Sequence, residues 1–146
     1  MTTATAVRTV HLVLGPDVRI LLERADRELD LARAASEPGE GFLHAHLAAL
    51  RLAGAVLAAT GSPAPRGRPR SAWERLSAAV PELASSAAYF ASGASTRSAV
   101  ETGRGHDVDV ALARAWESAA ERFRDEVVEL LGTGAGRLSP GRSWVS

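Results

Sequence analysis

The chain has 146 residues, equal numbers of acidic and basic side chains (17 of each) and no cysteine. This length fits one domain with a core of its own, and the balanced charge excludes a global field that would draw the protein onto nucleic acid or an acidic membrane. The lack of cysteine excludes disulfides, thiolate nucleophiles and cysteine-based zinc sites.

Every basic side chain is arginine, so an arginine in this chain is weaker evidence for phosphate recognition than usual. The apolar run at residues 10–14 is too short for a signal peptide, and no segment approaches the ~18–20 apolar residues of a membrane span. We therefore expect a cytoplasmic protein without a membrane partner, and a poorly defined N-terminal segment over residues 1–15.

The first helix is predicted over residues 16–36, with Asp17 as a candidate N-cap. Residues 37–41 contain a proline and two glycines and are predicted to form a tight connection. Apolar side chains three or four residues apart form one stripe along the helix. They are Val18, Leu22, Ala25, Leu29 and Ala32.

The second helix, predicted over residues 42–59, is apolar around most of its circumference and is therefore the expected central helix. It has more apolar surface than one neighbouring helix can cover, which favours a homodimer. His44 and His46 lie only two residues apart on it and point in opposite directions, so they do not form a metal chelate. We expect one near the core with a hydrogen bond and the other facing solvent, and nothing in the sequence predicts a cofactor or a metal site.

Residues 61–70 contain three prolines and are predicted to be an extended linker within the domain. Arg66, Arg68 and Arg70 form a basic cluster in this linker. A solvated linker is the favoured interpretation, because no aromatic side chains are interleaved with the arginines. The alternative is a mobile arm that binds RNA phosphates.

The third helical region starts at a capping box formed by Ser71 and Glu74. Its apolar spacing continues through Pro81, where we predict a kink or two abutting helices that face the same core. The aromatic side chains Trp73 and Tyr89 are predicted to be core residues, not stacking platforms for bases. The full stripe comprises Trp73, Leu76, Val80, Leu83, Ala87, Phe90 and Ala94.

The last helix has either Asp107 or Asp109 as its cap and is predicted to end at Gly132. Residues 133–146 are rich in Gly, Ser and Pro and are predicted to form a flexible tail. The fold predicted for residues 16–132 is an all-α, antiparallel bundle of four to five helices. The stripe of the last helix comprises Val108, Leu112, Trp116, Ala119, Phe123, Val127 and Leu130.

Residues 73–97 contain, in order, Trp-Glu-Arg-Leu, Val-Pro-Glu-Leu-Ala and Ala-Tyr-Phe-Ala-Ser-Gly-Ala-Ser-Thr-Arg. This order resembles the third helical region of an actinobacterial branch of the HEPN superfamily, and the resemblance extends over residues 16–132 through helix order and length. It implies a small helical bundle that often dimerises and is often linked to RNA or nucleotides.

The resemblance also implies a test for catalysis. Active HEPN ribonucleases carry an Arg followed four to six residues later by a His, and two copies meet across a dimer to cleave RNA without metal. Here eight residues separate Arg97 from His106, and one residue separates Arg104 from His106. Neither interval matches, so no catalytic residue can be assigned by motif.

The loop that contains Arg104, His106 and Asp107 precedes the last helix, whose N-terminus could receive a phosphate. His106 could then transfer a proton and Asp107 could orient its ring. The favoured interpretation is a polar loop at the start of a helix, with Asp107 as the cap.

These observations favour a non-enzymatic, dimeric binding or regulatory module linked to RNA or nucleotide physiology. One alternative is a metal-independent ribonuclease with a displaced site built on Arg97, Arg104 and His106. The other is a protein-interaction adapter that uses the linker and the tail and does not bind nucleic acid.

Overall fold

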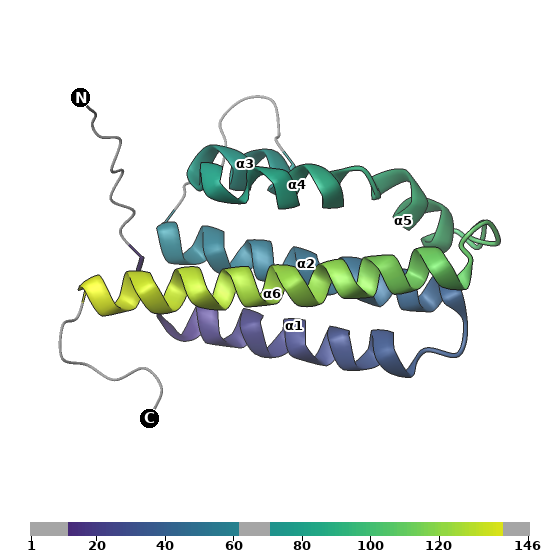
Figure 1. Cartoon of the computed structure of the whole chain (residues 1–146), viewed down its shortest axis with the longest axis horizontal. Coiled ribbons are helices and arrows are strands. Elements are labelled where there is room, and N and C mark those ends of the chain that lie inside the picture. The colour runs from purple at the N-terminus through teal and green to yellow at the C-terminus, as the bar shows by residue number, and fades with distance from the viewer. Residues whose placement is uncertain (1–11, 62–70, 139–146) are drawn as a thin grey trace.

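The computed structural model describes residues 12–61 and 71–138 of the chain, and all its regular elements within these ranges are helical (Figure 1). The all-α prediction is therefore confirmed. The elements are α1 (Pro16–Ala34), α2 (Pro38–Thr60), α3 (Ala72–Ala79), the short 3-10 turn η1 (Pro81–Leu83), α4 (Ala84–Ala91), α5 (Ala94–Glu101) and α6 (Val110–Leu138).

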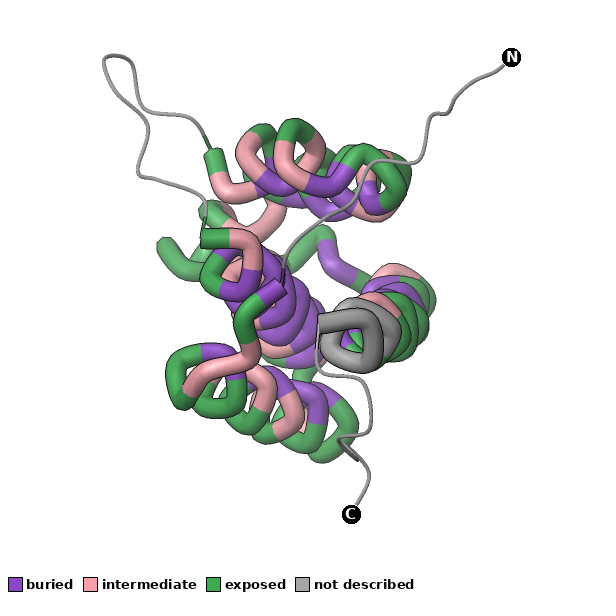
Figure 2. The backbone as a smooth tube through the Cα atoms, turned by 90° about the vertical axis from the view of Figure 1, so that its left-hand side faces the viewer, coloured by how far each residue is buried: buried purple, intermediate pink, exposed green. Residues whose placement is uncertain are grey.

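Helix α2 is the centre of the bundle, as predicted. Figure 2 shows it buried between α1, α6 and the pair formed by α3 and α4. Ala45, Ala48 and Ala49 are fully buried, and such small side chains let neighbouring helices approach closely. Its apolar circumference is thus covered inside one chain, so the physical reason given for a homodimer was wrong.

The composition of α2 has a second consequence. Among the described helices, α2 is the one long and apolar enough to cross a membrane, so the expectation that no segment approaches this composition was wrong. Most of its apolar window is buried inside the bundle, as in the core helix of a globular domain.

Both ends of the connection between α1 and α2 differ from the prediction. Helix α1 begins at Pro16 with Gly15 as its N-cap, and Asp17 lies in the first turn and does not cap it. Helix α2 begins at Pro38 and not at residue 42. Proline at the first helical position lacks only an N–H that would have no partner there, so it starts this helix and does not delay it.

The predicted capping box is confirmed at the start of α3. The backbone N–H of Glu74 donates to Ser71 Oγ at 3.1 Å, and the Ser71 N–H donates to Glu74 Oε1 at 2.9 Å. The break at Pro81 is also confirmed, in its two-helix form: α3 and α4 pack against each other, and the rings of Trp73 and Phe90 stack with centroids 5.4 Å apart.

A second break, at Ser92 and Gly93, divides α4 from α5 and was not predicted. Helix α5 still packs on α2 after this break, but Ala94 is exposed, in contrast to its predicted place in the apolar stripe. Gly93 itself packs against the indole ring of Trp116, which lies in the first half of α6.

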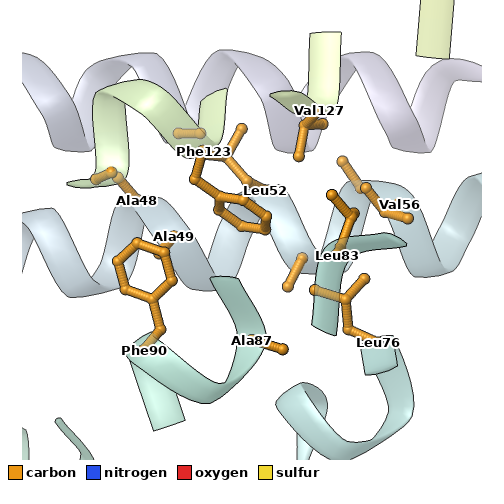
Figure 3. Packing of buried hydrophobic residues seen from close by; sticks show 14 of the residues in the cluster. Ala48, Ala49, Leu52, Val56, Leu76, Leu83, Ala87, Phe90, Phe123 and Val127 are labelled. Carbon is orange, nitrogen blue, oxygen red and sulfur yellow. The ribbon is translucent and has the colours of Figure 1, made fainter. Parts of the chain in front are cut away.

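Helix α6 is capped by Asp109, whose Oδ1 accepts a hydrogen bond of 2.8 Å from the Leu112 N–H. Of the two candidate caps, Asp109 is therefore correct and Asp107 is not. The helix continues through Gly132 to Leu138, so the predicted stop and the start of the tail at residue 133 were wrong. Figure 3 shows Phe123 and Val127 of α6 among the buried residues of α2, α3 and α4.

Candidate functional site

A cluster of aromatic rings fills the middle of the bundle. Trp116 of α6 lies at its centre, with ring centroids 4.8 Å from Phe42 and 4.5 Å from Tyr89. Phe90 meets Trp116 edge-on at 6.1 Å. Contacts of this kind contribute beyond simple burial, so the position of Trp116 is fixed from several sides.

Among the residues whose burial the structure describes, His46 is the one buried polar residue, at 2% exposure. Its Nδ1 accepts a hydrogen bond of 3.3 Å from Trp116 Nε1, which requires the neutral ring with its proton on the other nitrogen. Burial and the nearby positive charge of Arg97 lower the pKa of His46 to about 4. At neutral pH this side chain is therefore an uncharged structural acceptor.

The other histidine of the pair is only half buried. His44 Nδ1 lies 2.7 Å from Glu28 Oε1 of α1, so His44 is paired across a helix interface and does not face solvent freely. The prediction for the two histidines is thus confirmed for His46 and wrong in this respect for His44.

Arg97 lies on α5 with its side chain half buried. Its Nε is inaccessible to solvent, has no hydrogen-bond partner among the described residues, and lies 3.8 Å from Glu101 Oε1. Its charge acts on His46 of α2. Sequence reasoning missed this neighbourhood because the two residues are on different helices and no local spacing connects them.

The loop between α5 and α6 holds Arg104 and His106, two residues of the alternative displaced site, together with Asp107. Arg104 closes the end of α5, where its backbone N–H donates to the Ala99 carbonyl at 2.6 Å and its Nε donates to Thr102 Oγ1 at 3.0 Å. The side chains of Arg104, His106 and Asp107 are exposed. Within the described ranges, no hydrogen bond or ion pair joins any two of these three residues.

The N-terminus of α6 is a poor site for a phosphate because a carboxylate already occupies it. The carboxylate of Asp109 already accepts the Leu112 N–H, and its negative charge lies where an anionic ligand would approach the helix N-terminus. Arg66, Arg68 and Arg70 lie outside the described residues.

The described part of the structure has three surface depressions between its helices. One, of about 320 Å³, lies where α1, α2 and α6 meet and is lined by Arg33, Arg114 and Glu117 among others. A second, between α1 and α6, contains ion pairs of Arg124 with Asp26 at 2.6 Å and of Arg33 with Glu121 at 2.9 Å.

The third depression, of about 340 Å³, lies between α4 and α6 and has aromatic walls. Tyr89 lines it at 38% exposure, so the prediction of a core residue was wrong for Tyr89, whereas Trp73 is buried as predicted. Across the described part of the chain, no three acidic or histidine side chains are close enough together to hold a metal ion.

The long last helix packs on the buried second helix, and a broken third helical region lies between them in the sequence, so the fold is an all-α helical bundle. The family model for SAV_6107-like HEPN domains matches residues 32–128, and the chain belongs to this family. The match runs from the end of α1 into the second half of α6 and includes Arg97, Arg104 and His106. No curated protein and no solved structure matches the chain.

Proposed function

We propose that this HEPN protein is a non-enzymatic binding module linked to RNA or nucleotide physiology. The observation that supports this proposal is the state of its histidines. His46, the histidine on which the charge of Arg97 acts, is buried and neutral, and His106 is exposed with no side-chain partner in the described part of the chain.

Metal-independent cleavage of RNA needs a base at the 2′-hydroxyl and a cation at the developing phosphorane, both held near 3 Å from the reacting atoms. His46 cannot meet a polymeric substrate, because its ring is enclosed by Phe42, Trp73 and Trp116. His106 and Arg104 lie on a loop that leaves them unconnected. Binding without catalysis is the function that this geometry supports.

The homodimer remains part of the proposal and rests on the family resemblance. Exposed apolar side chains that could contribute to an interface include Ile20 and Leu31 of α1 and Val110 and Val128 of α6. Sedimentation equilibrium at tens of micromolar protein tests it, and a monomer at that concentration would remove it from the proposal.

The central experiment combines binding and cleavage in one sample. Purified protein is incubated with mixed-sequence RNA and EDTA, bound RNA is measured by fluorescence anisotropy, and RNA length is read on a denaturing gel. We expect binding and intact RNA. EDTA-resistant cleavage that disappears in a folded His106→Ala variant would establish the ribonuclease instead, and the absence of both binding and cleavage would favour the adapter.

The linker arginines provide a second arm of that experiment. If Arg66, Arg68 and Arg70 contact phosphates, the triple Ser variant should reduce the slope of log affinity against log salt concentration by up to about three, while far-UV circular dichroism stays unchanged. An unchanged slope would remove the linker from the binding surface.

A further inference from the structure

We propose that the groove between α4 and α6 binds a nucleotide, with the base stacked on Tyr89 and the phosphate paired with Arg122. This inference rests on the proposed function and assigns it to one surface. The groove is lined by Ser85, Ser86, Tyr89, Phe90, Ala119, Arg122, Phe123 and Glu126.

The α4–α6 groove differs from the other two depressions in the residues that line it. The arginines of the α1–α6 groove are already paired, Arg124 with Asp26 and Arg33 with Glu121. These ion pairs connect α1 to α6 and leave neither arginine free for a phosphate. The depression at the start of α2 has no aromatic wall. The α4–α6 groove combines an aromatic wall with a cation, which is the combination that recognises a base and its phosphate.

The aromatic wall is rigid where a base would contact it. One face of the Tyr89 ring stacks on Trp116 at 4.5 Å, with 29° between the planes, and Phe90 meets Tyr89 edge-on at 5.3 Å. Phe90 and Phe123 lie 5.4 Å apart and are buried. Because Tyr89 is held in this way and still partly exposed, stacking of a base on it costs little conformational entropy.

The polar groups of the groove match the rest of a nucleotide. Arg122 is exposed and forms no ion pair with any described residue, so its guanidinium is free for a phosphate. Glu126 is oriented by a hydrogen bond of 2.7 Å from Ser86 Oγ and can accept from the exocyclic amine of a base. The volume of about 340 Å³ is at the small end of ligand sites and suits one nucleotide unit.

This chemistry is the same for a free nucleotide and for one unit of a single strand, and two probes distinguish these sources. AMP is titrated by calorimetry, and a 5′-fluorescein-labelled single-stranded oligoadenylate by anisotropy, each up to about 1 mM, where the weakest specific binding is still measurable. Adenine carries an exocyclic amine, which can donate a hydrogen bond to the Glu126 carboxylate. Binding of AMP alone assigns the groove to free nucleotides, and binding of the oligonucleotide alone assigns it to a strand.

Variants then locate the site. Tyr89→Leu should weaken binding by about 5- to 100-fold, whereas Tyr89→Phe, which keeps the ring, should stay within about twofold. Arg122→Gln should lower the salt slope for the oligonucleotide by about one. Arg114→Gln is the matched control, because Arg114 is an exposed arginine of the same helix that lines a different depression, and it should leave binding unchanged.

The outcomes separate this inference from the proposed function. If the oligonucleotide binds the unchanged protein, and the Tyr89→Leu and Arg122→Gln variants bind it equally well, the nucleotide site is not in the α4–α6 groove. The proposed function then stands. If the unchanged protein binds neither of the two probes and does not bind mixed RNA, both the nucleotide site and the proposed function are wrong. If Tyr89→Leu unfolds, Arg122→Gln decides alone, because an exposed arginine without a partner can be replaced without loss of the fold.

Discussion

Gly93→Ala tests whether the break between α4 and α5 fixes the position of Trp116. A Cβ atom at residue 93 would lie 2.4 Å from Trp116 Cζ2, 3.1 Å from its Cη2 and 3.2 Å from Phe42 Cζ. Carbon atoms pack at about 3.5–4.0 Å, so the added methyl group enters the indole ring by about 1 Å. The ring cannot retreat easily, since Phe42, Tyr89 and the hydrogen bond to His46 hold it.

Two effects set the magnitude. Overpacking of a filled core costs about 1–3 kcal/mol. The backbone of Gly93, with φ −93° and ψ 5°, is open to alanine, so the variant also gains about 0.4–1 kcal/mol from a less flexible unfolded chain. The expected net loss in the free energy of unfolding is about 1–2 kcal/mol, measured by urea denaturation at pH 7.

Gly54→Ala is the matched control. Its Cβ would meet Leu21 Cδ1 at an ordinary 3.6 Å inside α2, and alanine favours a helix over glycine by about 1 kcal/mol, so this variant should be stabilised. A second variant, Gly93→Ala with Trp116→Phe, removes the ring atoms that the methyl group meets and should lose less than the sum of its single changes. A Gly93→Ala protein as stable as Gly54→Ala would refute this account of the break.

Three further predictions follow from the contacts of α2 and α6. Trp116→Ala should cost about 3–5 kcal/mol in urea unfolding, because it leaves a void at the centre of the core. Asp109→Ala should cost about 1 kcal/mol in the same assay through loss of the α6 cap. Because its folded pKa of about 4 is below the unfolded value near 6.5, His46 should make stability fall as pH drops from 6.5 toward 4, by at most about 3 kcal/mol. A folded His46→Gln variant, which keeps an acceptor for Trp116, should show a shallower fall over that range, and an equal fall would contradict the assignment.

The sequence predicted most of the fold because apolar spacing reports burial directly. The stripes of α1 and α6, the capping box at Ser71 and the break at Pro81 each depend on residues close in sequence. The errors have local causes as well. Pro38 was interpreted as a breaker although it occupies the first helical position, and the break at Gly93 was hidden because apolar spacing continued across it.

The candidate site was less predictable because it depends on tertiary contacts. The pairing of His46 with Trp116 and the effect of Arg97 on it connect three helices. Tyr89 was expected in the core because aromatic residues usually are. Only the packing of α4 beside α6 shows that Tyr89 lines a surface groove and remains partly exposed.

Periodicity also could not tell whether the apolar surface of α2 is covered by its own chain or by a second copy. The structure answers this for the described residues: α1, α3, α5 and α6 all pack on α2. Of the three depressions in the described part of the chain, the α4–α6 groove combines aromatic walls with an arginine that forms no ion pair there. Because Tyr89 rests on Trp116, the packing that Gly93 permits also supports the surface on which a base would stack.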